Sequence, residues 1–147
     1  MDPAPFDLAR CRQDEVIAAV EALEAALRGE RPLLAAAGAH LQFHLTRLVP
    51  LMRDEEAWLV PLIRQHLPPE VMHPGLIRRE HETIELLTSA IAEGVGRGAR
   101  DAEVEAELAT AVSDLCLLLR DHIRREADVV QPLLERLAAE HPERASS

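Results

Sequence analysis

Residues 101–139, DAEVEAELATAVSDLCLLLRDHIRREADVVQPLLERLAA, decide the fold of this chain. Apolar side chains recur there at intervals of three and four, and Asp101 suits a helix N-cap, so the stretch predicts one long amphipathic helix. Its inward stripe consists of Leu115, Leu119, Val129 and Leu133. His122 and Glu126 are four residues apart on that same stripe, so both side chains are expected to point into the core.

Three more helices are predicted before this one. The same periodicity marks residues 6–28, 33–66 and 76–93. Prolines and a glycine make LPPEVMHPG, residues 67–75, a turn, and the glycine-rich run GVGRGAR, residues 94–100, is expected to break the pattern again. We therefore predict an all-α, antiparallel up-down-up-down four-helix bundle. It forms a single domain over residues 1–147, with a core from about 7 to 137.

Composition excludes several classes of protein. With 48% apolar residues in a chain of 147, one domain can bury a core, and the low aromatic content of 2% disfavours a sheet protein. A net charge of -10 disfavours nucleic-acid binding. No apolar run is long enough to cross a membrane, and the opening residues lack an export signal. Cys11 and Cys116 do not form a disulfide framework, so we expect reduced thiols and a cytoplasmic protein.

The two halves of the sequence repeat one design. Pro61 and Pro132 lie inside predicted helices at matching places, where each is expected to kink or loosen its helix. A shift of 71 residues also places Glu55 on Glu126. A shift of 67 residues places Asp14, in the first helix, on His81 in the third. The bundle is therefore expected to consist of two similar helical hairpins.

Two polar residues from other helices are expected at the height of His122. Pairing across residues 94–100 puts His81 level with His122, and pairing across residues 67–75 brings Glu55 to the same layer. Buried imidazoles and carboxylates are costly unless paired, and a metal ion pairs both. Together with Glu126, these residues predict a metal site in the bundle core. A hydrogen-bonded polar core pair is the alternative for His122 and Glu126.

Four stretches of the sequence resemble the hemerythrin-like HHE cation-binding domains. They are QDEVIAAV (13–20), LMRDEEAWLVP (51–61), EHETIELL (80–87) and HIRREADVVQP (122–132). In that family a histidine opens the first and third helices, and His-x-x-x-Glu precedes a proline in the second and fourth. The resemblance covers residues 7–137 and implies a bundle that holds non-haem iron, often as a pair of ions bridged by two carboxylates.

The resemblance also implies a ligand set for this chain. Ligand positions of the family are occupied by His81, His122, Glu126 and Glu55. Asp14 and Leu51 stand where two further histidines belong, and leucine cannot bind a metal. The implied cofactor is thus one iron ion rather than two, with Asp14 as a weak extra oxygen donor. The donors would also accept zinc or manganese.

The resemblance favours a protein that binds O2 or NO, senses redox state, handles iron or responds to stress. Nothing in the sequence supports a hydrolase or kinase, because no nucleophile with its base and no phosphate-binding loop is present.

Two other interpretations stay open. One is a metal-free interaction protein that forms a homodimer through an exposed apolar helix face. The other is a haem or displaced-metal binder that uses His40 and His44, with carboxylates such as Glu93 or Asp114. Pro50 adds a further question, since a kink there would turn Glu55 away from the site.

Overall fold

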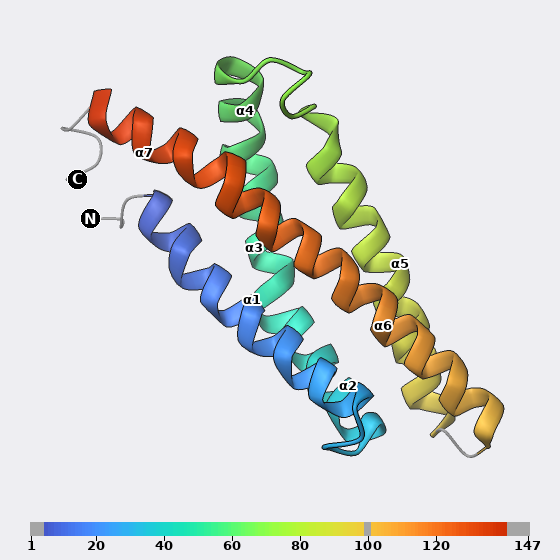
Figure 1. Ribbon diagram of the computed structural model, residues 1–147. Coiled ribbons are helices and arrows are strands. Elements are labelled where there is room, and N and C mark those ends of the chain that lie inside the picture. The colour runs from blue at the N-terminus through green and yellow to red at the C-terminus, as the bar shows by residue number, and fades with distance from the viewer. Residues whose placement is uncertain (1–4, 99–100, 141–147) are drawn as a thin grey trace.

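The computed structural model describes residues 5–98 and 101–140, and their side chains from residue 13 onward. Four long helices run through this part of the chain (Figure 1). The first is α1, Pro5–Leu27, and the third is α5, Gly75–Arg97. The second consists of α2 (Leu33–Phe43), η1 (His44–Leu48), α3 (Val49–Asp54), η2 (Glu55–Leu59) and α4 (Val60–His66), where η marks a π-helical turn. The fourth consists of α6 (Ala102–Arg125), η3 (Glu126–Val130) and α7 (Gln131–Glu140).

The helices close into a bundle in which each packs against two others. α1 contacts α2 and α6, and α5 contacts the same two helices. Figure 1 shows successive helices running in opposite directions, with α1 beside α6 and α5 on the other side of α6. The described residues contain no strand. The predicted all-α up-down-up-down bundle is therefore confirmed.

The helix ends follow from local chemistry, with one difference from prediction. Gly98 ends α5 in the left-handed conformation, at φ 74°, which costs glycine little. Sequence periodicity had placed this end near residue 93. The helix continues through Gly94, which is buried against Leu108, where a Cβ would lie 3.0 Å from the leucine Cδ1. This glycine therefore allows α5 and α6 to approach closely and does not break the helix.

Asp101 is the N-cap of α6, as predicted, and its Oδ1 accepts a hydrogen bond of 2.8 Å from the Val104 backbone N–H. We expect Asp101→Ala to lower the free energy of unfolding by about 1 kcal/mol, because that N–H loses its acceptor. Urea unfolding followed by circular dichroism measures the loss. Asp101→Asn keeps a capping oxygen and should behave like the parent protein; an equal loss in both variants would contradict a capping role.

Two apolar clusters fill the bundle, and a polar layer separates them. The larger cluster includes Val20, Leu48, Ile84 and Leu115. The smaller one is formed by Leu59, Ile63, Met72, Ile77, Val130 and Leu134. Between them along the second and fourth helices lie the buried side chains of Glu55, His122 and Glu126. The apolar core thus holds these polar groups away from water on both sides.

Three prolines are accommodated within the long helices by π turns. Pro50, Pro61 and Pro132 follow η1, η2 and η3. A proline inside a helix has no N–H to donate and crowds the carbonyl four residues earlier. One wider turn before each proline relieves that conflict. The predicted local loosening at Pro61 and Pro132 is confirmed, and Pro50 does not turn Glu55 away, since that side chain is 2% exposed.

Candidate metal centre

Three side chains from the second and fourth helices meet in the polar layer. Glu55 is the first residue of η2, Glu126 is the first residue of η3, and His122 lies one turn before Glu126. One ligand atom of each lies within 4.8 Å of the other two, and all three residues are buried. Among the described residues, this is the group of three whose ligand atoms lie close enough to share an ion.

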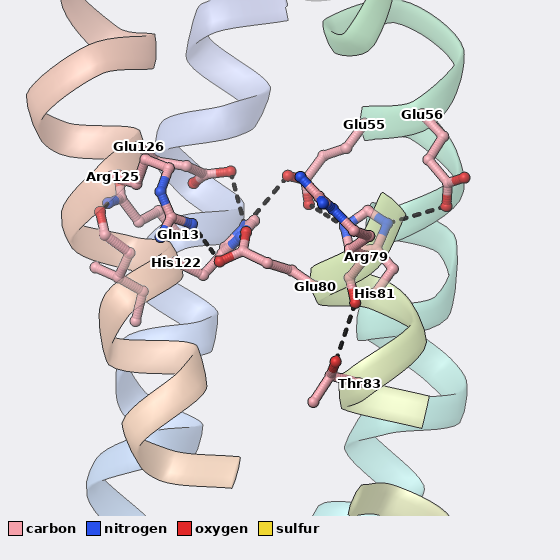
Figure 2. Close-up of polar contacts among 11 residues, drawn as sticks. Gln13, Glu55, Glu56, Arg79, Glu80, His81, Thr83, His122, Arg125 and Glu126 are labelled. Atoms are coloured by element: carbon pink, nitrogen blue, oxygen red, sulfur yellow. Dashed lines mark hydrogen bonds and ion pairs between the residues drawn. The ribbon is translucent and has the colours of Figure 1, made fainter. Parts of the chain in front are cut away.

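His122 is the centre of this group (Figure 2). Its Nε2 lies 3.1 Å from Glu126 Oε1 and 3.2 Å from Glu55 Oε2. His81, from α5, approaches from the other side, with its Nε2 3.7 Å from Glu55 Oε1. The two imidazole ring centroids are 6.2 Å apart. The structure therefore brings Glu55, His81, His122 and Glu126 to one height of the bundle.

Two further carboxylates orient the imidazoles from outside. Glu56 lies 2.9 Å from His81 Nδ1, and Glu80 lies 3.2 Å from His122 Nδ1. Each carboxylate in turn contacts an arginine: Arg78 lies 3.4 Å from Glu56, and Arg125 pairs with Glu80. A carboxylate at Nδ1 fixes the ring and leaves Nε2 for a ligand, which is the usual arrangement around metal-binding histidines. Sequence reasoning missed both glutamates.

In the metal-free protein, protons on the two histidines and on Glu126 balance the negative charges of the polar layer. Burial disfavours ionisation of Glu55, but the positive charge and hydrogen bonds of His122 outweigh it and hold the pKa of Glu55 well below its usual range. Burial and the nearby charge of Glu55 raise the pKa of Glu126 from 4.5 to about 7. Burial opposes protonation of His122 and His81, yet their glutamate neighbours raise both pKa values above 6.5.

The donors that face one another fit a divalent cation. His81 Nε2 is buried without a hydrogen bond to any described residue, and the Glu55 Oε1 atom lies 3.7 Å from it. A buried polar atom without a hydrogen bond costs about 1–3 kcal/mol, so this nitrogen, beside the Glu55 carboxylate, marks a place where a partner is needed. Imidazole nitrogen and carboxylate oxygen together suit iron, zinc or manganese. Residues His81, His122, Glu126 and Glu55 are therefore those that would hold the ion.

Asp14 is not brought to this layer, because its side chain is exposed on α1. The half-buried Gln13 lies there instead, and its Nε2 donates to the Ile123 carbonyl at 3.1 Å. The buried residues Val16, Val20 and Leu23 of α1 match Ile84, Thr88 and Ile91 of α5. A shift of 68 residues therefore superposes the buried residues of α1 on those of α5, and the predicted shift of 67 residues is wrong. Gln13 is the structural counterpart of His81.

Leu51 lies where the family resemblance places a histidine of the second helix. It is buried one turn before Glu55, as His122 is buried one turn before Glu126. Glutamine and leucine thus stand where the second hairpin has two histidines. The first hairpin therefore contributes the Glu55 carboxylate and the Gln13 amide to the layer. The second hairpin contributes two imidazoles and the Glu126 carboxylate.

A cavity of about 460 Å³ opens to the surface beside α5 and is lined by one residue of the layer, His81. Its lining includes Met52, Arg53, Glu56, Arg78 and His81. Glu56 and Arg78, which hold His81 from outside, thus also form the wall of this cavity. The cavity thus reaches one side of the His81 ring, whereas His81 Nε2, which faces the centre, is buried.

His40 and His44 lie apart from this centre, in the second helix. A cavity of about 640 Å³ between α1 and α2 is lined largely by alanines and by His40. Neither ring nitrogen of His40 is exposed, however, so the imidazole does not present a nitrogen to the cavity as a haem ligand would. His44 contacts Glu85, and the predicted carboxylate partners Glu93 and Asp114 are exposed. The structure gives the haem interpretation no support.

These features define a class of protein, the four-helix bundle with a buried histidine and carboxylate centre between its helices. The sequence matches the hemerythrin HHE cation-binding domain over residues 11–134. The chain belongs to this family. Comparison with curated proteins and with solved structures gave no significant match. No helix in the described ranges is both long and apolar enough to span a membrane.

Proposed function

We propose that this protein binds one non-haem iron ion through His81, His122, Glu126 and Glu55. The observation that carries the proposal is the buried group of Glu55, His122 and Glu126, with the unpaired His81 Nε2 beside it. The preference for iron rests on the family, because the donors alone would also take zinc or manganese. One ion is favoured over two because Gln13 and Leu51 replace the imidazoles of the first hairpin.

Such a centre suits a sensor or an iron-handling protein. When bound, a ferrous ion with an open coordination position supplies binding of O2 or NO and one-electron redox chemistry. The protein's own part is to hold the donors rigidly and to keep the layer dry between two apolar clusters. We propose the cavity beside His81 as the side from which small ligands approach. We include in the proposal a cytoplasmic location and a role in sensing, storage or stress response.

Iron content tests the proposal directly. Protein purified without chelator, or reconstituted with ferrous ion without oxygen, is expected to hold about one iron per chain by mass spectrometry of the metal. Iron near zero, together with a homodimer in solution, would favour the metal-free interaction protein instead. A second iron at full occupancy that is lost together with the first in His122→Ala would contradict the assignment of a single ion to this centre.

The pH dependence of stability should differ between the metal-free and iron-loaded protein. Without metal, Glu126 takes up its proton below about pH 7 in the folded state but only near pH 4.5 when unfolded. The folded imidazoles of His81 and His122 likewise retain protons above pH 6.5. Because the folded state holds more protons than the unfolded state, its free energy of unfolding falls as pH rises from about 5 to about 8.

A bound dication reverses this trend. Metal binding needs neutral imidazoles and ionised carboxylates, so it releases protons and strengthens as pH rises. Urea unfolding at several pH values, with chelator and with ferrous ion, measures both slopes. Glu126→Gln has no proton to lose and should flatten the slope of the metal-free protein. Equal slopes with and without iron would show that these groups do not bind it.

A further inference from the structure

The three π turns of the chain share one design. η1 begins at His44, η2 at Glu55 and η3 at Glu126. In each, the backbone N–H of the residue after the turn donates to the carbonyl of its first residue, which closes the wide turn. In each, a proline follows six residues after that first residue, at Pro50, Pro61 and Pro132. The three turns are thus copies of one local structure.

The first residue of every copy is polar and points into the core. Glu55 and Glu126 are buried and belong to the metal centre, and His44 is 3% exposed. A proline explains why the turn widens, but it does not explain why a polar side chain stands at the inward position. His44 therefore occupies, within its own turn, the position of the two carboxylates at the centre.

Three imidazole nitrogens near this turn are without partners. Both nitrogens of His40 and Nδ1 of His44 are buried and form no hydrogen bond with any described residue. His40 lies one turn before His44 on the same face of the helix. Burial and the neighbouring His44 lower the pKa of His40 to about 4, so its ring is neutral near pH 7. A neutral buried imidazole is a ready donor to a cation.

The fold itself does not need imidazoles at these places. In the second hairpin the shift of 71 residues puts Ala111 and Leu115 at the positions of His40 and His44, and both are buried in the core. An apolar pair thus fills the same space in the other half of the bundle. Histidines that a packed core does not require, and that lack hydrogen bonds, point to a bound ligand.

A carboxylate completes the donor set. Glu85, from α5, lies with its Oε1 3.0 Å from His44 Nε2, and its side chain is 54% exposed. It also lines the cavity that opens beside His81, so this carboxylate is reached from solvent. Two imidazoles and one carboxylate are a ligand set of protein zinc sites, so they suit Zn²⁺ and the Co²⁺ that can replace it.

We infer that His40, His44 and Glu85 form a second metal site, one that takes Zn²⁺ or its substitute Co²⁺. The site lies about 16 Å along the helix from Glu55, at 1.5 Å per residue, so it is separate from the first centre. His44 and Glu85 already face each other. The ligand atoms of His40, His44 and Glu85 do not all lie within 4.8 Å of one another, so the site closes only when the His40 ring rotates toward the ion. The proposal stands whether or not the first centre holds iron.

Cobalt(II) binding to the full-length metal-free protein tests the inference, because its visible spectrum and its stoichiometry report on coordination. The parent protein is expected to bind two Co²⁺ ions. His44→Leu and His40→Ala carry the residues of the other hairpin and should fold; each should bind one ion fewer. His122→Ala should lose the other ion and keep this one. Glu82→Gln, a neighbour in the same cavity wall, is the matched control and should bind as the parent does.

The outcomes separate this site from the first centre. If His44→Leu and His40→Ala bind as many Co²⁺ ions as the parent, with an unchanged spectrum, the second site is refuted. If His122→Ala binds normally while His44→Leu loses an ion, the second site stands and the proposed iron centre fails.

Discussion

Replacing His122 with alanine is expected to abolish iron binding. Its Nε2 is the nitrogen that approaches both Glu55 and Glu126, at 3.2 and 3.1 Å, and Glu80 fixes the ring from the other side. Without this imidazole the two carboxylates and His81 no longer surround one point. The iron content of the reconstituted variant, measured per chain, should fall from about one to near zero.

Loss of His122 also leaves buried carboxylates without their positive partner. Removing one partner of a buried pair costs roughly 3 kcal/mol, so the metal-free variant should unfold at a lower urea concentration than the parent. Circular dichroism must therefore show that the variant is folded before its iron content is compared. His66→Ala removes a histidine outside the layer and is the control. A folded His122→Ala protein with the iron content of the parent would refute the centre.

Most of the fold could be predicted because the helical signal is continuous. The expected helices at 6–28, 33–66 and 101–139 agree with the structure to within about a residue at each end. The end of α5 was missed, since glycine reads as a helix breaker in a sequence. Gly94 is instead a packing residue, and only the neighbouring side chain of Leu108 reveals this.

The height of the polar layer could also be predicted from the sequence. Which residue of the first helix points toward that layer could not. Antiparallel pairing fixes the level of His81, Glu55 and His122, and the structure brings them together. In QDEVIAAV, by contrast, both Val16 and Ile17 are apolar, so the periodicity allows two alignments that differ by one residue. Burial of Val16, but not of Ile17, selects the alignment that turns Gln13 inward and Asp14 outward.

The sequence gives only a weak indication of Glu56 and Glu80, the carboxylates that contact the Nδ1 atoms of the two histidines. Glu80 lies on the stripe of Ile77, Ile84 and Ile91, where a charged residue is out of place. That position alone would have marked it as a buried partner. Glu56 gives no such sign, because it follows Glu55 in an acidic run and its role depends on where His81 lies in space.

Restoring two histidines should raise the iron content from about one to about two per chain. Leu51→His places an imidazole one turn before Glu55, as His122 stands before Glu126. Gln13→His places another at the counterpart of His81. Each hairpin would then offer two imidazoles and one glutamate, and Glu55 and Glu126 lie close enough to share their oxygens between two ions. Leu51→His alone should give an intermediate count.

Iron per chain and electron paramagnetic resonance measure the result, because two ferric ions that share a carboxylate couple and lose the signal of an isolated ferric ion. Leu48→His is the control, since it adds a buried imidazole one turn farther from the layer. If the folded double variant holds no more iron than the parent, Gln13 or Leu51 does not face the centre. If Leu48→His gains as much iron as the double variant, the gain comes from added histidine and not from its place in the repeat.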